Sequence, residues 1–159
     1  MLQPLEWTDS FSVAHPALDA EHRDIMLAIR KIAEAEDDRK HLRPLLCDLK
    51  EKAAAHFEHE SAILRAIVAS TSSARHSHRF IAAMSQALVD EHLAEHDVAL
   101  ASLEFMIRRT LTDTSQPLPA PGDVLTHWFI NHAIKHDGHL KTLFQTMEKD
   151  CPDLLRSVA

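Results

Sequence analysis

The chain has 159 residues, 45% of them hydrophobic and 26% charged, which is the composition of an ordinary globular protein and fits one domain over residues 1–159. The formal net charge of −7 argues against nucleic acid or an anionic membrane as the partner, because both bind basic surfaces. No apolar run approaches the ~20 residues of a membrane span, and two cysteines are too few for a disulfide framework, so we expect a cytoplasmic protein.

The predicted elements are an arm followed by four helices. The segment before Leu18, which contains Trp7 and Phe11, has no helical period and is predicted to be an extended amino-terminal arm, residues 1–17. Apolar residues then recur with helical spacing in four segments, 18–32, 49–67, 89–106 and 125–147. Stripes of this kind face the core of a helix bundle, so each segment is predicted to be a bundle helix.

Polar or proline-containing breaks separate the four helices. They fall at residues 37–39, 70–73 and 112–122, and Asp123 is a plausible N-cap of the last helix. Pro152 is expected to end that helix soon after Cys151, which leaves residues 152–159 as a tail. This order predicts an all-α fold, an antiparallel up-down-up-down four-helix bundle over residues 18–151.

Histidine is the unusual component, with thirteen residues and no terminal run that an expression tag would explain. Each predicted helix carries ionisable residues in register with its apolar stripe, although most core stripes contain none because an unpaired buried charge is costly. These residues are His22, His56, Glu60, His92, His96 and His132, with Asp137 one step off its stripe. A single such histidine is usually an ordinary buried imidazole. Seven donors on four helices favour a metal centre, which uses both imidazole lone pairs and carboxylate charge.

Sequence spacing places the seven donors at one depth of the bundle. Two residues on successive helices lie at the same level when they are equally far from the turn between them, at about 1.5 Å per residue. The midpoints between successive groups fall at positions 40, 76 and about 114, next to or inside the predicted breaks. His76 and His78 lie at the second break, and residues two apart on a helix point about 200° apart, so they are predicted to be solvated turn histidines.

The last helix offers two candidates for one ligand. On an ideal helix Asp137 lies about 140° from His132, whereas His136 is four residues away and shares its face. His59 is expected to face a neighbouring helix or solvent. The remaining histidines are expected at the surface or in loops: His15, His41, His127 and His139.

These residues resemble the motifs of the hemerythrin family, in particular the bacterial hemerythrin-like proteins (bacteriohemerythrins). The opening EWTDSFSVAHPALDAEHRDI is similar to the family's Trp-containing arm followed by Asp-x-x-His, here Asp19 and His22. HFEHE resembles its His-Phe-x-x-Glu, EHLAEHDVAL its His-x-x-x-His, and WFINHAIKHD its Trp-x-x-x-His-x-x-x-x-Asp. The motifs occur in order over nearly the whole chain.

The resemblance implies a non-haem diiron centre, with two iron ions and an oxo or hydroxo bridge. One iron would be held by His92, His96 and His132 and the other by His22 and His56, with Glu60 and Asp137 bridging them. The positions that wall the family's oxygen pocket match Ile25, Phe57, Trp128 and Phe129. The family's spacing favours Asp137 over His136 as the bridge.

The chain departs from the family pattern at positions that are not ligands. Glu60 and His92 are 32 residues apart, roughly double the usual spacing, which predicts a lengthened second and third helix or a longer connection. A protein partner could use this lengthened hairpin. Ala14 stands where glycine is usual, Ser61 replaces a common second glutamate, and Ala133 replaces a larger aliphatic residue.

The resemblance implies reversible binding of dioxygen, for delivery, storage or sensing, and an enzyme is not expected. The alternative is a diiron enzyme acting on oxygen, peroxide or nitric oxide, but bundle enzymes that activate oxygen usually carry Glu-x-x-His motifs. This chain has no Glu-x-x-His and no tyrosine, and five of the seven donors are histidines. A structural bundle with another metal, such as zinc, is the third possibility, although zinc takes only four ligands in a closed tetrahedron.

Overall fold

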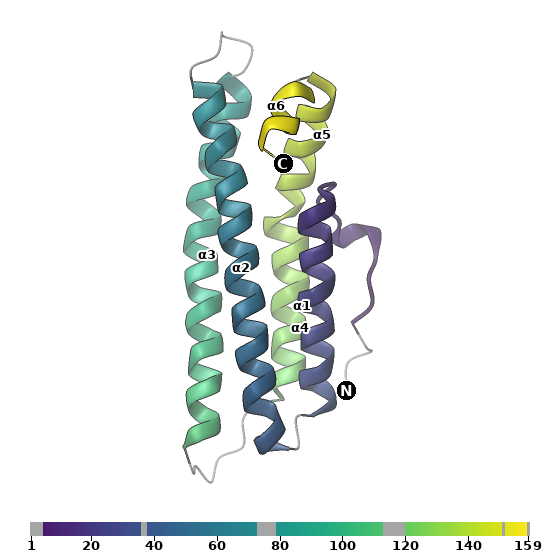
Figure 1. Cartoon of the computed structure of the whole chain (residues 1–159), viewed down its shortest axis with the longest axis vertical. Coiled ribbons are helices and arrows are strands. Elements are labelled where there is room, and N and C mark those ends of the chain that lie inside the picture. Colours follow the sequence, from purple (N-terminus) through teal and green to yellow (C-terminus); the bar gives the residue numbers. More distant parts are fainter. Residues whose placement is uncertain (1–4, 36–37, 73–78, 113–119, 151, 159) are drawn as a thin grey trace.

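The chain is an all-α protein built as a four-helix bundle (Figure 1). The structure, a computed structural model, describes residues 5–35, 38–72, 79–112, 120–150 and 152–158. Its elements are a 3-10 turn Asp9–Phe11, α1 Pro16–Glu34, α2 Arg39–Ser72, α3 Arg79–Leu111, α4 Pro121–Asn131, a π-helical turn His132–His136, α5 Gly138–Asp150 and α6 Pro152–Val158. None of these helices is long and apolar enough, over the residues described, to cross a membrane.

Successive helices alternate in direction, which confirms the predicted bundle. In Figure 1, α1 and α3 run one way, α2 runs the other, and α4, the π-helical turn and α5 follow one another as the fourth rod. Close packing of α1 on α4 depends on Gly122, because a Cβ at this position would lie 2.5 Å from the Cβ of Ala33.

Two boundaries near the carboxyl end differ from the prediction. α4 begins at Pro121, with Ala120 as its N-cap residue, so the predicted N-cap Asp123 lies instead in the first turn. Proline suits the first helical position because the helix leaves that N–H unpaired, and an acidic side chain in the first turn interacts favourably with the helix dipole. α5 ends at Asp150 as expected from Pro152, but the predicted tail is itself helical over Pro152–Val158.

The amino-terminal arm is held to the bundle by hydrogen bonds and by apolar anchors. Asp19, in the first turn of α1, accepts a hydrogen bond from the backbone N–H of Val13 at 2.8 Å. Phe11 and Val13 are buried, and Trp7 packs edge-on against Phe11. The guanidinium of Arg23 lies 3.9 Å from the centre of the Trp7 ring, a cation–π contact that closes the arm over α1.

Ala14 adopts a backbone conformation that favours glycine. Its φ of 59° is in the left-handed region, where a non-glycine residue costs about 1–2 kcal/mol because its Cβ crowds the carbonyl oxygen. We expect Ala14→Gly to raise the free energy of unfolding by about 0.5–1 kcal/mol, since the larger unfolded-state entropy of glycine offsets part of the relief. Urea denaturation measures the change. The control Ala20→Gly, at an exposed position inside α1, is expected to lower stability by about 1 kcal/mol, and similar losses for both variants would contradict the strain at Ala14.

Two apolar clusters fill the bundle. The large cluster includes Phe11, Ile25, Ile29, Ile32, Leu42, Leu46, Leu49, Phe57, Leu103, Leu125 and Phe129. The small cluster comprises Val13, Leu18, Ile63, Leu64, Ile67, Val89, Leu140, Leu143, Phe144 and Met147. The predicted donors lie near the point where each bundle helix passes from the large cluster to the small one, so the candidate site is a polar layer with apolar packing on both sides.

The α2–α3 hairpin is long, as the spacing between Glu60 and His92 predicts. α2 has 34 residues and α3 has 33, against 19 in α1. In Figure 1 the hairpin extends past the start of α1, and α5 and α6 lie beside this extension. Val68 of α2 and Leu155 of α6 pack on the small cluster, so the chain's own last helices cover this part of the hairpin. The connection, with His76 and His78, lies outside the described residues.

Candidate metal centre

All seven predicted donors meet in the buried layer between the clusters. They are His22 of α1, His56 and Glu60 of α2, His92 and His96 of α3, His132 of the π-helical turn and Asp137 directly after it. None of them is more than 3% exposed. The seven donors therefore meet at one depth of the folded bundle, as their spacing in the sequence predicts.

Asp137 lies at the centre of this layer. Its Oδ2 is 3.2 Å from His22 Nε2 and 3.3 Å from His132 Nε2, while its Oδ1 is 3.1 Å from His92 Nε2. Two donors that share one ion at about 2.1 Å, at an angle near 90°, are about 3.0 Å apart. The distances from the Asp137 oxygens to the three imidazoles are therefore those expected between two ligands of the same ion.

Glu60 and the imidazole pair on α1 and α2 complete the layer. Glu60 Oε2 is 3.1 Å from His96 Nε2, and Oε1 is 3.7 Å from His92 Nε2. The Nε2 atoms of His22 and His56 are 3.1 Å apart. Lone-pair atoms from all four bundle helices therefore converge on a small volume.

Several of these inward-facing atoms have no hydrogen-bond partner among the described residues. They are both oxygens of Glu60, Nε2 of His96, Nε2 of His132 and Oδ2 of Asp137. Glu60 and His96 approach closely, but their angles are not those of a hydrogen bond. Buried polar atoms are nearly always paired because desolvation is costly, so unpaired donors that face one another fit a layer that a cation completes.

The donors form three overlapping groups in which the candidate ligand atoms lie within 4.8 Å of one another. The groups are His22, His56, His132 and Asp137; Glu60, His96 and His132; and Glu60, His92 and Asp137. His132, Glu60 and Asp137 each belong to two groups, as ligands shared by adjacent positions would. The buried cluster could therefore hold metal ions.

A π-helical turn brings Asp137 to the same side of the helix as His132, although the two residues would lie about 140° apart on an ideal α-helix. The backbone N–H of Asp137 donates to the carbonyl of His132 at 3.1 Å, a bond across five residues instead of the four of an α-helix. The wider turn brings the carboxylate back beneath the imidazole, whereas uniform α-helical steps would separate them. His136 lies outside the candidate groups and is half-buried, with its Nδ1 3.2 Å from Glu91 Oε1. The structure thus places Asp137, and not the reserve candidate, with the other donors.

Two glutamates that were not predicted from the sequence hold the outer nitrogens of the imidazoles. Glu95 Oε2 accepts from His132 Nδ1 at 2.8 Å, and its Oε1 accepts from the Trp128 indole at 3.2 Å. Glu21 Oε2 accepts from His56 Nδ1 at 2.9 Å. Each of these glutamates directly precedes a donor histidine in the sequence, and its carboxylate bonds to a histidine of another helix. The repeated Glu-His dipeptide is the feature of the sequence from which these hydrogen-bond partners could have been predicted.

His132 and Asp137 form an ion pair in the layer, and each shifts the pKa of the other. Burial lowers the pKa of His132, but Asp137, the hydrogen bond to Glu95 and the charge of Glu60 outweigh it and raise that pKa to about 9. Burial raises the pKa of Asp137, but the charge of His132, the nearby His22 imidazole and the hydrogen bond from His92 hold it well below the usual range. The Asp137 carboxylate is therefore ionised. Without metal, the His132 imidazole is protonated on both nitrogens and positively charged at neutral pH.

The predicted pocket residues lie against the donors. The Phe57 ring stacks on His96 at 3.8 Å between centroids, and Trp128 stacks on His132 at 5.5 Å. Phe129 meets His22 edge-on at 5.9 Å. Ile25 is buried in the large cluster with Phe57 and Phe129. These side chains form the apolar wall of one side of the layer.

The other histidines fall in several environments. His15 was expected at the surface, but it is 5% exposed, because its ring packs on Phe144 and its Nδ1 accepts from the Leu18 N–H at the start of α1. His41, expected in a loop, lies exposed in the first turn of α2. His127 and His139 are exposed, as expected, and His59 is partly exposed and faces Glu21.

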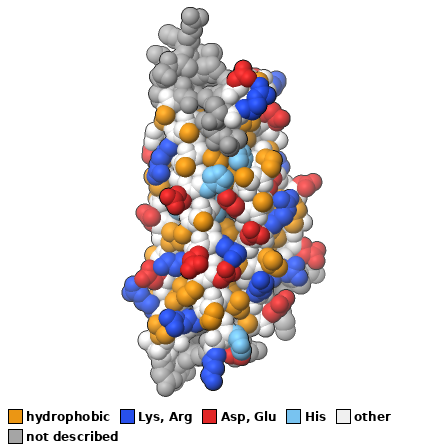
Figure 2. All heavy atoms as spheres, in the orientation of Figure 1, with side chains coloured by type: hydrophobic (Ala, Val, Ile, Leu, Met, Phe, Trp, Pro, Cys, Tyr) orange, Lys and Arg blue, Asp and Glu red, His pale blue; other side chains and the backbone are white. Residues whose placement is uncertain are grey.

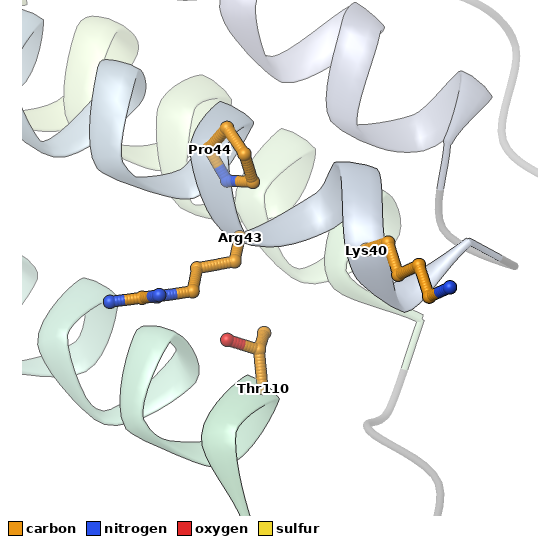
Figure 3. Close-up of a pocket in the computed structure, with 4 residues that line it drawn as sticks. All are labelled: Lys40, Arg43, Pro44 and Thr110. Atoms are coloured by element: carbon orange, nitrogen blue, oxygen red, sulfur yellow. The ribbon is translucent and has the colours of Figure 1, made fainter.

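The protein surface offers a hollow far from the donors. It is lined by Lys40, Arg43, Pro44 and Thr110, at the start of α2 and the end of α3 (Figure 3). None of the seven buried donors borders it, so the candidate centre is separate from this hollow. On the face shown in Figure 2, acidic and basic side chains are interspersed, and imidazoles reach the surface about half-way along the molecule.

Comparison of the chain with protein-family models, curated proteins and solved structures gave no significant match.

Proposed function

We propose that this chain is a non-haem diiron protein that binds dioxygen reversibly, for delivery, storage or sensing, and that it is not an enzyme. The observation that supports the proposal is the buried layer of five imidazoles and two carboxylates, with overlapping ligand groups and unpaired inward-facing atoms. Seven donors are too many for one tetrahedral zinc ion, and a mixed imidazole and carboxylate set suits iron. The choice of iron and of dioxygen comes from the likeness of the motifs to those of hemerythrins.

The residues of the layer would divide the binding of the metal pair between them. Glu60 and Asp137 would be the shared ligands, since each belongs to two of the three donor groups. A bound iron pair would supply the electrons and the open coordination position that dioxygen binding needs. Phe57, Trp128 and Phe129 would exclude water from the layer, which slows irreversible oxidation of a reduced centre.

Metal analysis followed by anaerobic reduction and exposure to dioxygen in a spectrometer tests the proposal. We expect two iron ions per chain and a visible charge-transfer band that forms with dioxygen and is lost when the gas is removed, over repeated cycles. Zinc in place of iron would refute a diiron protein. Steady consumption of dioxygen, peroxide or nitric oxide without a reversible band would refute the binding function in favour of the enzyme.

A further inference from the structure

The donor imidazoles of α1 and α2 are held by hydrogen bonds to atoms outside the layer, as His132 is by Glu95. His22 Nδ1 is 3.2 Å from the carbonyl oxygen of Phe11, and His56 Nδ1 is 2.9 Å from Glu21 Oε2. Carbonyl and carboxylate oxygens can only accept, so Nδ1 is the donor in both rings. The tautomer is thereby set, and the Nε2 lone pair of each ring faces the layer, ready for a cation.

His96 has no comparable bond within the described chain. Its Nδ1 is buried without a hydrogen-bond partner, and its ring instead lies flat on Phe57 at an interplanar angle of 6°. Stacking fixes the plane of the ring but not the nitrogen that carries the proton. Its neighbour Glu60 likewise receives no hydrogen bond at either oxygen from a described residue. Packing on Phe57 therefore holds the His96 ring in place.

Glu21 bonds two imidazoles of α2 at once. Besides His56, it accepts from His59 Nδ1 through Oε1 at 2.7 Å. The His56 side chain is fully buried, whereas those of Glu21 and His59 are about one-third exposed. The Glu21 carboxylate of α1 therefore bonds to His56 and His59 on successive turns of α2. The second bond holds the carboxylate in place and so fixes His56 more firmly than one bond would.

We propose that the two metal positions are unequal: the position on the His22–His56 side is preorganised by Glu21 and binds a divalent cation first and more tightly, and the position beside His96 and Glu60 fills second. Glu21 does not reach the cation and is a positioning residue that acts through His56. The inference rests on the proposed two-metal function. It is consistent with the larger donor group on that side, which contains His22, His56, His132 and Asp137.

Titration of the full-length, metal-free protein with Co²⁺ under anaerobic conditions, followed by calorimetry and visible absorbance, tests this order. We expect two binding steps that differ at least about tenfold in affinity. Glu21→Gln keeps the size of the side chain but removes the charge and one acceptor, so we expect it to weaken the first step by about 10–100-fold and to leave the second unchanged.

Two control variants separate positioning from a general loss of structure. Glu91→Gln alters a similar cross-helix bond, to His136, which is not in a donor group, so neither step should change. His59→Ala leaves the bond from His56 to Glu21 in place, and we expect a smaller effect on the first step than Glu21→Gln gives. Thermal unfolding of each metal-free variant checks that the bundle is intact.

Two equal steps in the unaltered protein, or equal weakening of both steps by Glu21→Gln, would overturn the inference. Its failure differs from failure of the proposed function. Two equal cobalt sites in a protein whose iron form binds dioxygen reversibly would refute only the order of binding. Ordered cobalt binding without reversible oxygen binding would refute only the oxygen function.

Discussion

Removal of the Asp137 carboxylate is expected to abolish tight binding of the metal pair, whereas removal of the His136 imidazole should leave both ions bound. Asp137 lies within 3.3 Å of His22, His92 and His132, and it belongs to two of the three donor groups. Loss of an outer hydrogen bond to a ligand costs about 10–100-fold in affinity, so loss of a shared ligand should cost more than 100-fold.

The comparison uses Asp137→Asn and Asp137→Ala beside His136→Ala, with metal content and affinity measured for each. Breaking a buried ion pair by removing one partner can cost about 3–5 kcal/mol, so the alanine variant risks poor folding. The asparagine variant keeps the shape of the side chain and serves as the folded test. Metal loss in His136→Ala with retention in Asp137→Asn would show that the imidazole is the ligand.

The metal-free protein is expected to lose stability as the pH rises from about 6.5 to about 9. The pKa of His132 is raised from 6.5 to about 9 in the fold, so its proton stabilises the folded state fully below pH 6.5. This contribution disappears as the pH passes about 9, and a shift of this size corresponds to on the order of 3 kcal/mol. The lowered pKa of Asp137 affects stability only when the pH falls below about 3.8, outside this range.

Urea denaturation of chelator-treated protein between pH 6.5 and 9.5 measures this slope. His132→Gln removes the titrating group and should flatten it, which separates His132 from other groups that titrate there. In the metal-loaded protein His132 is expected to be a neutral ligand, so the same loss should be absent and metal affinity should rise with pH. Equal stability of the metal-free protein at both ends of the range would contradict the charge state assigned to His132.

The helices and the depth of the site could be predicted because both depend on periodicity. Apolar stripes identify a bundle, and equal distances from the turns place His22, His56, His92 and His132 at one level whatever the side-chain detail. The length of the α2–α3 hairpin likewise follows from counting residues between Glu60 and His92.

Features that depend on departures from regular geometry were not predictable in the same way. The position of Asp137 follows from one wider turn, which uniform α-helical steps cannot represent. Burial of His15 depends on its contact with Phe144, far along the chain. Glu21 and Glu95 lie on the outer side of the donors, at positions where the apolar pattern of the sequence predicts exposure to solvent. In each case a tertiary contact decides the role of the residue.

The two apolar clusters give the candidate centre a mechanical role as well. Each rod of the bundle passes from one dry core to the other through the layer of imidazoles and carboxylates. The protein therefore has two apolar cores, one on each side of the layer. An ion ligated by residues of all four bundle helices would cross-link those helices between the two cores. How cooperatively the end formed by α5 and α6 moves with the rest of the protein should then depend on what the layer holds.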